Sequence, residues 1–223
     1  MAVNTEKYKE ILKELNGKAT LVAVSKTKPV EDLQALYDLG QRDFGENYVQ
    51  ELVDKQAVLP KDIRWHFIGH LQTNKVKLIA PFVQLIHGTD SLKLLAEINK
   101  QGEKIGRVID CLLQIHIAQE ETKFGFDEEE FNLTVSQIHT LKMGHARVCG
   151  LMGMASLTDD MNKVRKEFQY LKKFFDKQKT QNKEFETLSM GMSSDYKLAL
   201  EEGSTMVRIG SLLFGERSKP VKN

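Results

Sequence analysis

Short apolar runs alternate with amphipathic segments along the whole chain. Each run has the length of a strand and is rich in β-branched and aliphatic residues. In the segment that follows each run, apolar residues recur every three or four positions, as on one face of a helix. This alternation predicts parallel strands joined by helices. The predicted strands cover residues 20–25, 42–45, 65–68, 83–87, 108–117, 146–152, 187–190 and 206–209.

The expected helices follow from the same pattern and from their capping residues. The first helix places Tyr8, Ile11, Leu12 and Leu15 on one face and stops at Gly17. We expect the others in residues 30–40, 48–58, 73–79, 92–102, around 164–175 and 195–203, with one more after residue 127.

Three of these helices have a side chain that can cap their first turn. Thr73 and Ser91 are expected N-caps, and Asp127 forms a capping box with Glu130 three residues later. Gly102 is expected to end the helix that begins after Ser91.

Eight strands with helices between them are typical of a (β/α)8 TIM barrel, here with an extra helix at its N-terminus. A doubly wound open sheet is the alternative α/β architecture. The even alternation, and polar residues suited to function after several different strands, favour the barrel. Because no internal repeat, low-complexity tract or Pro/Gly linker interrupts the pattern, we expect a single domain over residues 1–223.

Composition narrows the class of partner and the compartment. The 32 basic and 31 acidic residues leave a net charge of +1, which indicates neither nucleic acid nor an anionic membrane as the main partner. No apolar stretch is long enough to span a bilayer, and the charged N-terminus does not resemble a signal peptide. Cys111 and Cys149 are isolated, so we expect reduced core residues and a cytoplasmic protein.

Lys26 is the first candidate for chemistry. It follows the apolar run of residues 20–25 and precedes a turn at Pro29. The C-terminal mouth of a parallel strand is where α/β folds place their reactive groups, and a partly desolvated amine there favours the neutral, nucleophilic form. Such an amine can form a Schiff base with an aldehyde. The competing interpretation is a solvated loop lysine, which is how we interpret Lys28.

Three further segments, taken together with the one that carries Lys26, resemble a known protein family. They are residues 44–51 (FGENYVQE), residues 65–75 (WHFIGHLQTNK), and the pair 189–195 (SMGMSSD) and 206–211 (MVRIGS). Together with the lysine segment they resemble the pyridoxal phosphate homeostasis protein family. The resemblance runs from about residue 6 to residue 215, and the string at 65–75 is its most specific part.

The resemblance implies a barrel similar to that of alanine racemase, with pyridoxal 5′-phosphate (PLP) held as a Schiff base on Lys26. It also implies a role in intracellular PLP homeostasis, in which the protein buffers the cofactor or delivers it transiently to PLP-dependent apo-enzymes. Amino-acid and keto-acid metabolism would be affected through those enzymes.

A phosphate site is expected in the loops after the last two strands. TIM barrels often bind phosphate there with backbone N–H groups and hydroxyls. Ser193 and Ser194 follow the seventh predicted strand, and Gly210 and Ser211 follow the eighth. The alternative is that Ser194 or the next residue caps a helix, which is compatible with phosphate binding.

Arg208 lies among apolar residues on the eighth predicted strand and therefore needs a buried partner. An ion pair inside the barrel is one interpretation. The resemblance implies another, in which the arginine faces the pyridine nitrogen of PLP. Because an arginine only donates hydrogen bonds, it would keep that nitrogen unprotonated and the cofactor a weak electron sink.

Asn47 ends the second predicted strand and could orient either the cofactor ring oxygen or Lys26. Its alternative role is an N-cap for the helix that follows. We interpret His66, His116 and His145 as structural residues, the first inside the barrel.

Three functions stay open at this point. The chain ends at Asn223, soon after the last predicted strand, so we expect it to lack the β domain and the partner tyrosine of alanine racemase. A monomeric PLP carrier is therefore the leading hypothesis. The alternatives are a PLP-dependent amino-acid racemase or lyase of weak activity, and a cofactor-free barrel that serves as an interaction module.

Overall fold

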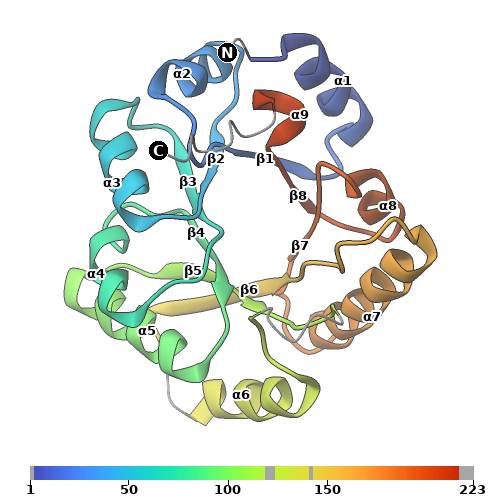
Figure 1. The fold of residues 1–223 in the computed structure, drawn as a ribbon. Helices are drawn as coiled ribbons and strands as arrows, with labels where there is room; N and C mark the ends of the chain where they lie inside the picture. Colours follow the sequence, from blue (N-terminus) through green and yellow to red (C-terminus); the bar gives the residue numbers. More distant parts are fainter. Residues whose placement is uncertain (1–2, 119–123, 141–142, 216–223) are drawn as a thin grey trace, which may run out of the picture.

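Eight parallel strands close into a barrel in the computed structural model, which describes residues 3–118, 124–140 and 143–215 (Figure 1). Each strand pairs with the next, and the last pairs with the first. The TIM-barrel prediction is therefore confirmed, and the open sheet is excluded. The strands are β1 (Thr20–Val24), β2 (Asp43–Glu46), β3 (Arg64–Phe67), β4 (Leu85–Thr89), β5 (Ile109–Gln114), β6 (Ala146–Met152), β7 (Thr187–Met192) and β8 (Met206–Ile209).

Helices surround the barrel in an outer ring (Figure 1). They are α1 (Thr5–Leu15), α2 (Val30–Asp38), α3 (Val49–Val58), α4 (Val76–Ile79), α5 (Leu92–Ile105), α6 (Glu128–Thr140), α7 (Met161–Lys179), α8 (Tyr196–Glu201) and α9 (Ser211–Phe214), with a 3-10 turn, η1 (Thr73–Lys75), before α4. The extra N-terminal helix, α1, packs beside α9, and its Glu14 accepts a hydrogen bond from Tyr196 at 2.6 Å.

Two expected helix boundaries are wrong for identifiable reasons. Gly102 lies inside α5 and not at its end. Close packing accounts for the glycine, because a Cβ there would lie 2.6 Å from the backbone oxygens of Arg107 and His145. The helix ends instead at Gly106, which adopts a left-handed conformation with φ of 63°. Thr73 is the first residue of η1 and not the cap of α4.

The expected capping box at α6 is confirmed. The backbone N–H of Glu130 donates to the Asp127 carboxylate at 2.8 Å, and the Asp127 N–H donates back to the Glu130 carboxylate at 3.2 Å.

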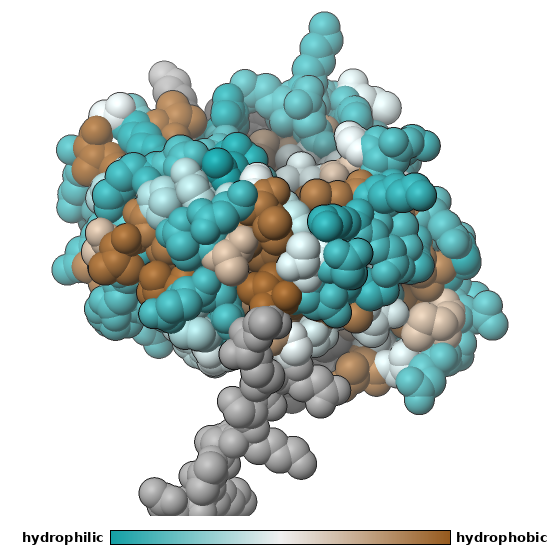
Figure 2. Space-filling view, turned by 90° about the horizontal axis from the view of Figure 1, so that it is seen from above, coloured by the Kyte–Doolittle hydropathy of each residue, from teal (hydrophilic) through white to brown (hydrophobic). Residues whose placement is uncertain are grey.

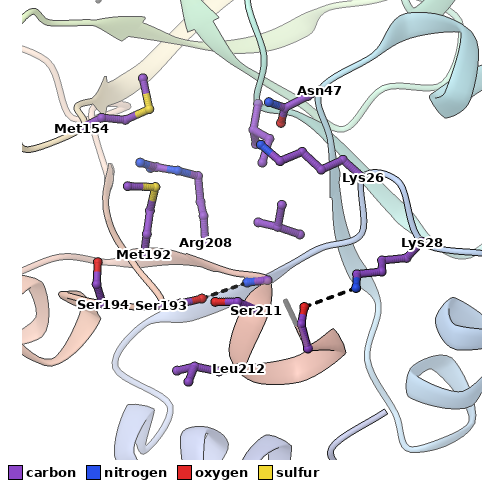
Figure 3. Close-up of a pocket in the computed structure, with 14 residues that line it drawn as sticks. Lys26, Lys28, Asn47, Met154, Met192, Ser193, Ser194, Arg208, Ser211 and Leu212 are labelled. Atoms are coloured by element: carbon purple, nitrogen blue, oxygen red, sulfur yellow. Dashed lines mark hydrogen bonds between the residues drawn. The ribbon is translucent and has the colours of Figure 1, made fainter. Parts of the chain in front are cut away.

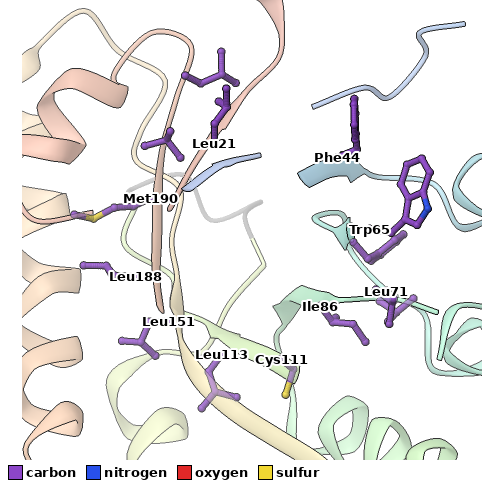
Figure 4. Packing of buried hydrophobic residues seen from close by; sticks show 14 of the residues in the cluster. Leu21, Phe44, Trp65, Leu71, Ile86, Cys111, Leu113, Leu151, Leu188 and Met190 are labelled. Carbon is purple, nitrogen blue, oxygen red and sulfur yellow. The ribbon is translucent and has the colours of Figure 1, made fainter. Parts of the chain in front are cut away.

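Side chains along each strand alternate between two layers, because successive residues of a strand point to opposite faces. Leu21, Phe44 and Trp65 point outward into the apolar layer between sheet and helices (Figure 4). Val22 and Leu112 instead belong to a smaller apolar cluster inside the barrel. The outer layer holds most of the buried hydrophobic residues and attaches the helical ring to the sheet.

The barrel interior also contains a polar group at the N-terminal end of the strands. Asp43 of β2 accepts two hydrogen bonds from Arg64 of β3, at 2.8 and 2.5 Å, and a third from His66 at 3.0 Å. His66 is therefore a hydrogen-bonded core histidine, as expected. Burial alone would raise the pKa of Asp43, but the hydrogen bonds from Arg64 and His66 outweigh it and lower that pKa to about 2.

Hydrophilic residues cover most of the outer face seen in Figure 2, with smaller hydrophobic areas between them. Within the described part of the chain, the helices lack the length and apolar character that crossing a bilayer requires.

Replacing Asp43 should make stability depend less on pH. The pKa of this carboxyl is lower in the folded chain than in the unfolded chain, so its stabilisation is complete above about pH 5 and disappears as the pH falls toward 2. The lowered pKa corresponds to roughly 2 kcal/mol. We expect Asp43→Asn to unfold at lower urea concentration at pH 7, and its difference from the wild type to narrow by about 1 kcal/mol at pH 3.

Asp54→Asn is the matched control, because this exposed carboxylate on α3 bonds to Gln50 on the protein surface. Its free energy of unfolding should follow the wild type at both pH values. A gap between Asp43→Asn and wild type that stays constant from pH 7 to pH 3 would contradict the assignment.

Candidate functional site

A cavity of about 440 Å³ opens where the C-terminal ends of the strands meet (Figure 3). The residues that form it lie in the C-terminal parts of six of the eight strands or after them, and are Val24, Lys26, Lys28, Asn47, Ile68, Met154, Met192, Ser193, Ser194, Arg208, Gly210, Ser211, Leu212 and Gly215. All seven residues that the sequence proposed for cofactor binding are among them. The barrel thus brings together residues that are up to 185 positions apart, from Lys26 to Ser211.

Lys26 and Lys28 leave the same turn in different directions. The turn follows β1 and is closed by a hydrogen bond from the Lys28 N–H to the Ser25 carbonyl at 3.0 Å. In Figure 3 the Lys26 side chain points across the cavity toward Arg208. The Lys28 amine instead donates to the backbone carbonyls of Phe214 and Gly215, at 2.8 and 3.2 Å. Lys26 is therefore the better placed of the two to react with a bound molecule.

Asn47 lines the cavity and does not act as the N-cap of α3. That helix begins at Val49, its N-cap position is Tyr48, and no side chain caps it. The backbone of Asn47 is held closely by Gly69, where an added Cβ would lie 2.4 Å from the Asn47 carbonyl oxygen. Because Gly69 has no side chain, the loops after β2 and β3 can pack directly against each other here.

The loops after β7 and β8 are joined to each other. The Ser193 hydroxyl accepts a hydrogen bond from the Gly210 N–H at 3.2 Å (Figure 3). The carboxylate of Asp195 accepts one from the Met192 N–H at 2.6 Å, which closes the first loop on itself. Together the two loops present hydroxyls and backbone groups to one side of the cavity, opposite Lys26.

Arg208 is buried at the floor of this cavity. Its guanidinium donates to the Ser189 hydroxyl at 2.5 Å and to the Gly153 carbonyl at 3.0 Å. Both of these acceptors are neutral, so the two contacts do not form the ion pair that was one of the two interpretations of Arg208. Burial lowers the pKa of Arg208 to about 10, a shift that Asp195 partly opposes, so the side chain stays charged at neutral pH.

A line of hydrogen bonds connects Arg208 to Asp43. Ser189 lies 3.0 Å from Nδ1 of His87, and Nε2 of His87 lies 3.0 Å from Nδ1 of His66. Arg208 can only donate and ionised Asp43 can only accept. With both rings neutral, one arrangement satisfies every group: each donates toward Asp43, from the guanidinium through the hydroxyl and the two imidazoles. Burial lowers the pKa of His87 well below its usual value, which agrees with a neutral ring.

The sequence analysis did not identify several residues that line the cavity or support its floor. Ile68, Met154 and Met192 form apolar walls of the cavity, but each reads as an ordinary core residue in its segment. His87 and Ser189 carried a weak signal, since each is a polar residue on the inward face of an otherwise apolar strand. The alternation along a strand indicates that these two side chains point into the barrel. It does not show that they pair with each other, because β4 and β7 meet only in the folded barrel.

A phosphorylated aromatic aldehyde matches the donors of this cavity. An aldehyde reacts with a primary amine, which Lys26 carries, and an aromatic ring nitrogen accepts hydrogen bonds from N–H donors such as those of Arg208. The loops after β7 and β8 provide the hydroxyls and backbone groups that suit a phosphate. Among residues 3–118, 124–140 and 143–215, we find no cluster of three or more histidine, cysteine or carboxylate side chains suited to a metal ion.

Comparison with known proteins identifies the family of this chain. Residues 1–218 match the family described as alanine racemase, N-terminal domain. The chain is 43% identical to the pyridoxal phosphate homeostasis protein of Aquifex aeolicus, over 89% of this chain and 87% of that protein.

Two solved structures of PipY from Synechococcus elongatus superpose on this fold. PipY without PLP has a TM-score of 0.89, and PipY with PLP bound has a TM-score of 0.85, each at 33% identity over 94% of this chain and 99% of PipY. Alanine racemase from Bartonella henselae, at 16% identity and a TM-score of 0.69 over 97% of this chain and 60% of the racemase, shares the barrel fold. By its extended similarity to these relatives, the chain belongs to the pyridoxal phosphate homeostasis protein family, on the barrel shared with the alanine racemase N-terminal domain.

Proposed function

We propose that this chain binds PLP in the cavity at the C-terminal ends of its strands, as a Schiff base on Lys26, and acts in PLP homeostasis. The observation that carries the proposal is the convergence of an amine, a buried guanidinium and two polar loops on one cavity. A family whose curated members are named for PLP homeostasis, and a related structure with PLP bound, support it.

Each side of the cavity has a distinct task in this proposal. The Lys26 amine would hold PLP through the cofactor's aldehyde, a group that condenses with a primary amine and releases water. Arg208 donates a hydrogen bond to the ring nitrogen and leaves it unprotonated. Asn47 orients the ring from the side of Lys26. The loops that carry Ser193, Ser194, Gly210 and Ser211 hold the phosphate.

The proposed role is carriage of the cofactor and not turnover. Racemisation needs a proton donor or acceptor on each face of the substrate. In the described part of the chain, the ionisable side chains that line the cavity are Lys26, Lys28 and Arg208. The lysines come from one turn, and a charged arginine is a poor base.

The partners and the setting belong to the same proposal. The chain would release PLP transiently to apo-enzymes and would work as a monomer in the cytoplasm. The two free cysteines support a reducing compartment. Burial raises the pKa of the Cys149 thiol to about 12, which leaves that thiol unreactive.

The lysine assignment predicts a clear difference between two neighbouring variants. We expect wild type mixed with PLP to show an absorption band shifted from that of free PLP, and to carry a borohydride-trapped adduct by mass spectrometry. Lys26→Ala should lose both, because it lacks the amine that faces the cavity. Lys28→Ala is the matched control and should keep both, since its amine bonds to the chain near α9. A trapped adduct of normal yield in Lys26→Ala would refute the assignment.

The phosphate assignment predicts competition by a simple anion. Inorganic phosphate should weaken binding of PLP but not of pyridoxal, which lacks the phosphate group. Wild type should also bind PLP at least about tenfold more tightly than pyridoxal, because charge-assisted hydrogen bonds to the phosphate contribute 1.4 kcal/mol or more. Equal titration midpoints for the two aldehydes, measured by absorbance, would remove the phosphate site.

Racemase activity separates carriage from catalysis. We expect the PLP-loaded protein to racemise L-alanine no faster than the same concentration of free PLP, because a second base is required. Chiral chromatography over a day at pH 8 measures this. Turnover well above free PLP that disappears in Lys26→Ala would instead favour the amino-acid racemase or lyase.

A further inference from the structure

The turn that carries Lys26 has a backbone conformation that its sequence does not favour. Thr27 adopts a positive φ of 63°, in the left-handed region that glycine and asparagine prefer. It occupies the third position of the turn closed by Lys28 N–H and Ser25 carbonyl, where a positive φ calls for glycine. A β-branched residue is unfavourable there, so other contacts must hold the turn.

Those contacts come from a charged cluster on the outer side of the barrel. Lys55 of α3 donates to three acceptors: the Ser25 carbonyl at 2.8 Å, Glu46 at 2.8 Å and Glu51 at 2.7 Å. The same oxygen of Glu51 accepts the Thr27 N–H at 2.6 Å. Two backbone groups that flank Lys26, one on each side, are therefore bound to a single cluster.

The cluster is built into the fold and not a surface ion pair. The side chains of Lys55 and Glu46 are 7% and 0% exposed, and Glu51 is 23% exposed. Glu46 is the last residue of β2 and points outward to α3, where it also accepts the Ser25 hydroxyl at 2.6 Å. The three donors of the buried ammonium are all used, and one of their acceptors is the Ser25 carbonyl of the Lys26 turn. Burial raises the pKa of Glu46, and Lys55 and Ser25 oppose that rise, while the second carboxylate oxygen, Oε2, has no hydrogen-bond partner.

We propose that the Glu46–Glu51–Lys55 cluster is a positioning device, which holds the Lys26 turn in its left-handed conformation and so presents the Lys26 amine to the cavity. The inference rests on the proposed role of Lys26 in PLP binding. Without the cluster the turn would spend part of its time in other conformations. Adduct formation would then slow in proportion to the fraction of chains that keep the observed turn.

Glu51→Ala is the sharpest variant, because it removes the acceptor of the Thr27 N–H and keeps the buried Lys55–Glu46 pair. We expect PLP adduct formation, followed by absorbance, to slow about tenfold, the loss corresponding to one charge-assisted hydrogen bond. Adding Thr27→Gly should restore most of the rate, because glycine adopts a positive φ without side-chain strain. Asp54→Ala on the same helix is the matched control and should react as wild type does, since its carboxylate bonds to Gln50.

A second measurement needs no cofactor. Hydrogen exchange of the Thr27 amide, followed by NMR in the protein alone, should be protected in wild type and Asp54→Ala. Glu51→Ala should lose at least about tenfold of that protection. A merely structural contribution to stability would instead raise exchange throughout the barrel.

The adduct kinetics and the hydrogen exchange of Thr27 together test whether the cluster positions Lys26. Wild-type kinetics and Thr27 protection in Glu51→Ala would overturn the inference, and so would a slow variant that Thr27→Gly does not restore. If wild type forms no adduct at all, the proposed function of Lys26 fails. The exchange result then still shows whether the cluster holds the turn.

Discussion

Pairing of the first strand with the last is the constraint on which the rest of the structure depends. β1 and β8 run parallel with Val22 beside Arg208, and this pairing closes the sheet. Closure places the turn after β1 next to the loop after β8, although most of the chain lies between them. It also brings the loops after β2 and β7 to the same mouth. An open sheet with the same strands would leave the candidate residues at separate points along an edge.

Closure also creates two environments for the side chains of one strand. Outward residues join the apolar layer beneath the helices, and inward residues must fit the narrow interior. Part of that interior is polar, and its groups satisfy one another from Arg208 to Asp43. Arg208 can only donate and ionised Asp43 can only accept, so with both histidine rings neutral the hydrogen bonds between them share one direction. Hydrogen bonds thus connect the floor of the cavity to the opposite end of the barrel.

The mouth of the barrel is organised by a different kind of contact. At the floor, neutral acceptors hold a charged arginine. At the rim, a charged cluster holds neutral backbone groups on both sides of Lys26. Both arrangements fix a donor that points into the cavity, and both draw on residues from neighbouring strands and helices. The loops after β7 and β8 are joined by a neutral contact, the hydrogen bond from the Gly210 N–H to the Ser193 hydroxyl.

The amino-acid sequence by itself determined the order of strands and helices, because apolar periodicity is a local property of the chain. It also singled out Lys26, Asn47 and Arg208, since each is a polar residue at a strand end or on a buried strand. Helix ends were less well predicted, as Gly102 shows, because a glycine can serve close packing as well as termination.

Only the tertiary structure decided which side chains meet. The partners of Arg208, the line through His87, and the contact of Lys55 with Ser25 all join elements that are distant in sequence. Such contacts follow from barrel closure and strand register, which depend on the packing of the whole chain and on no local pattern.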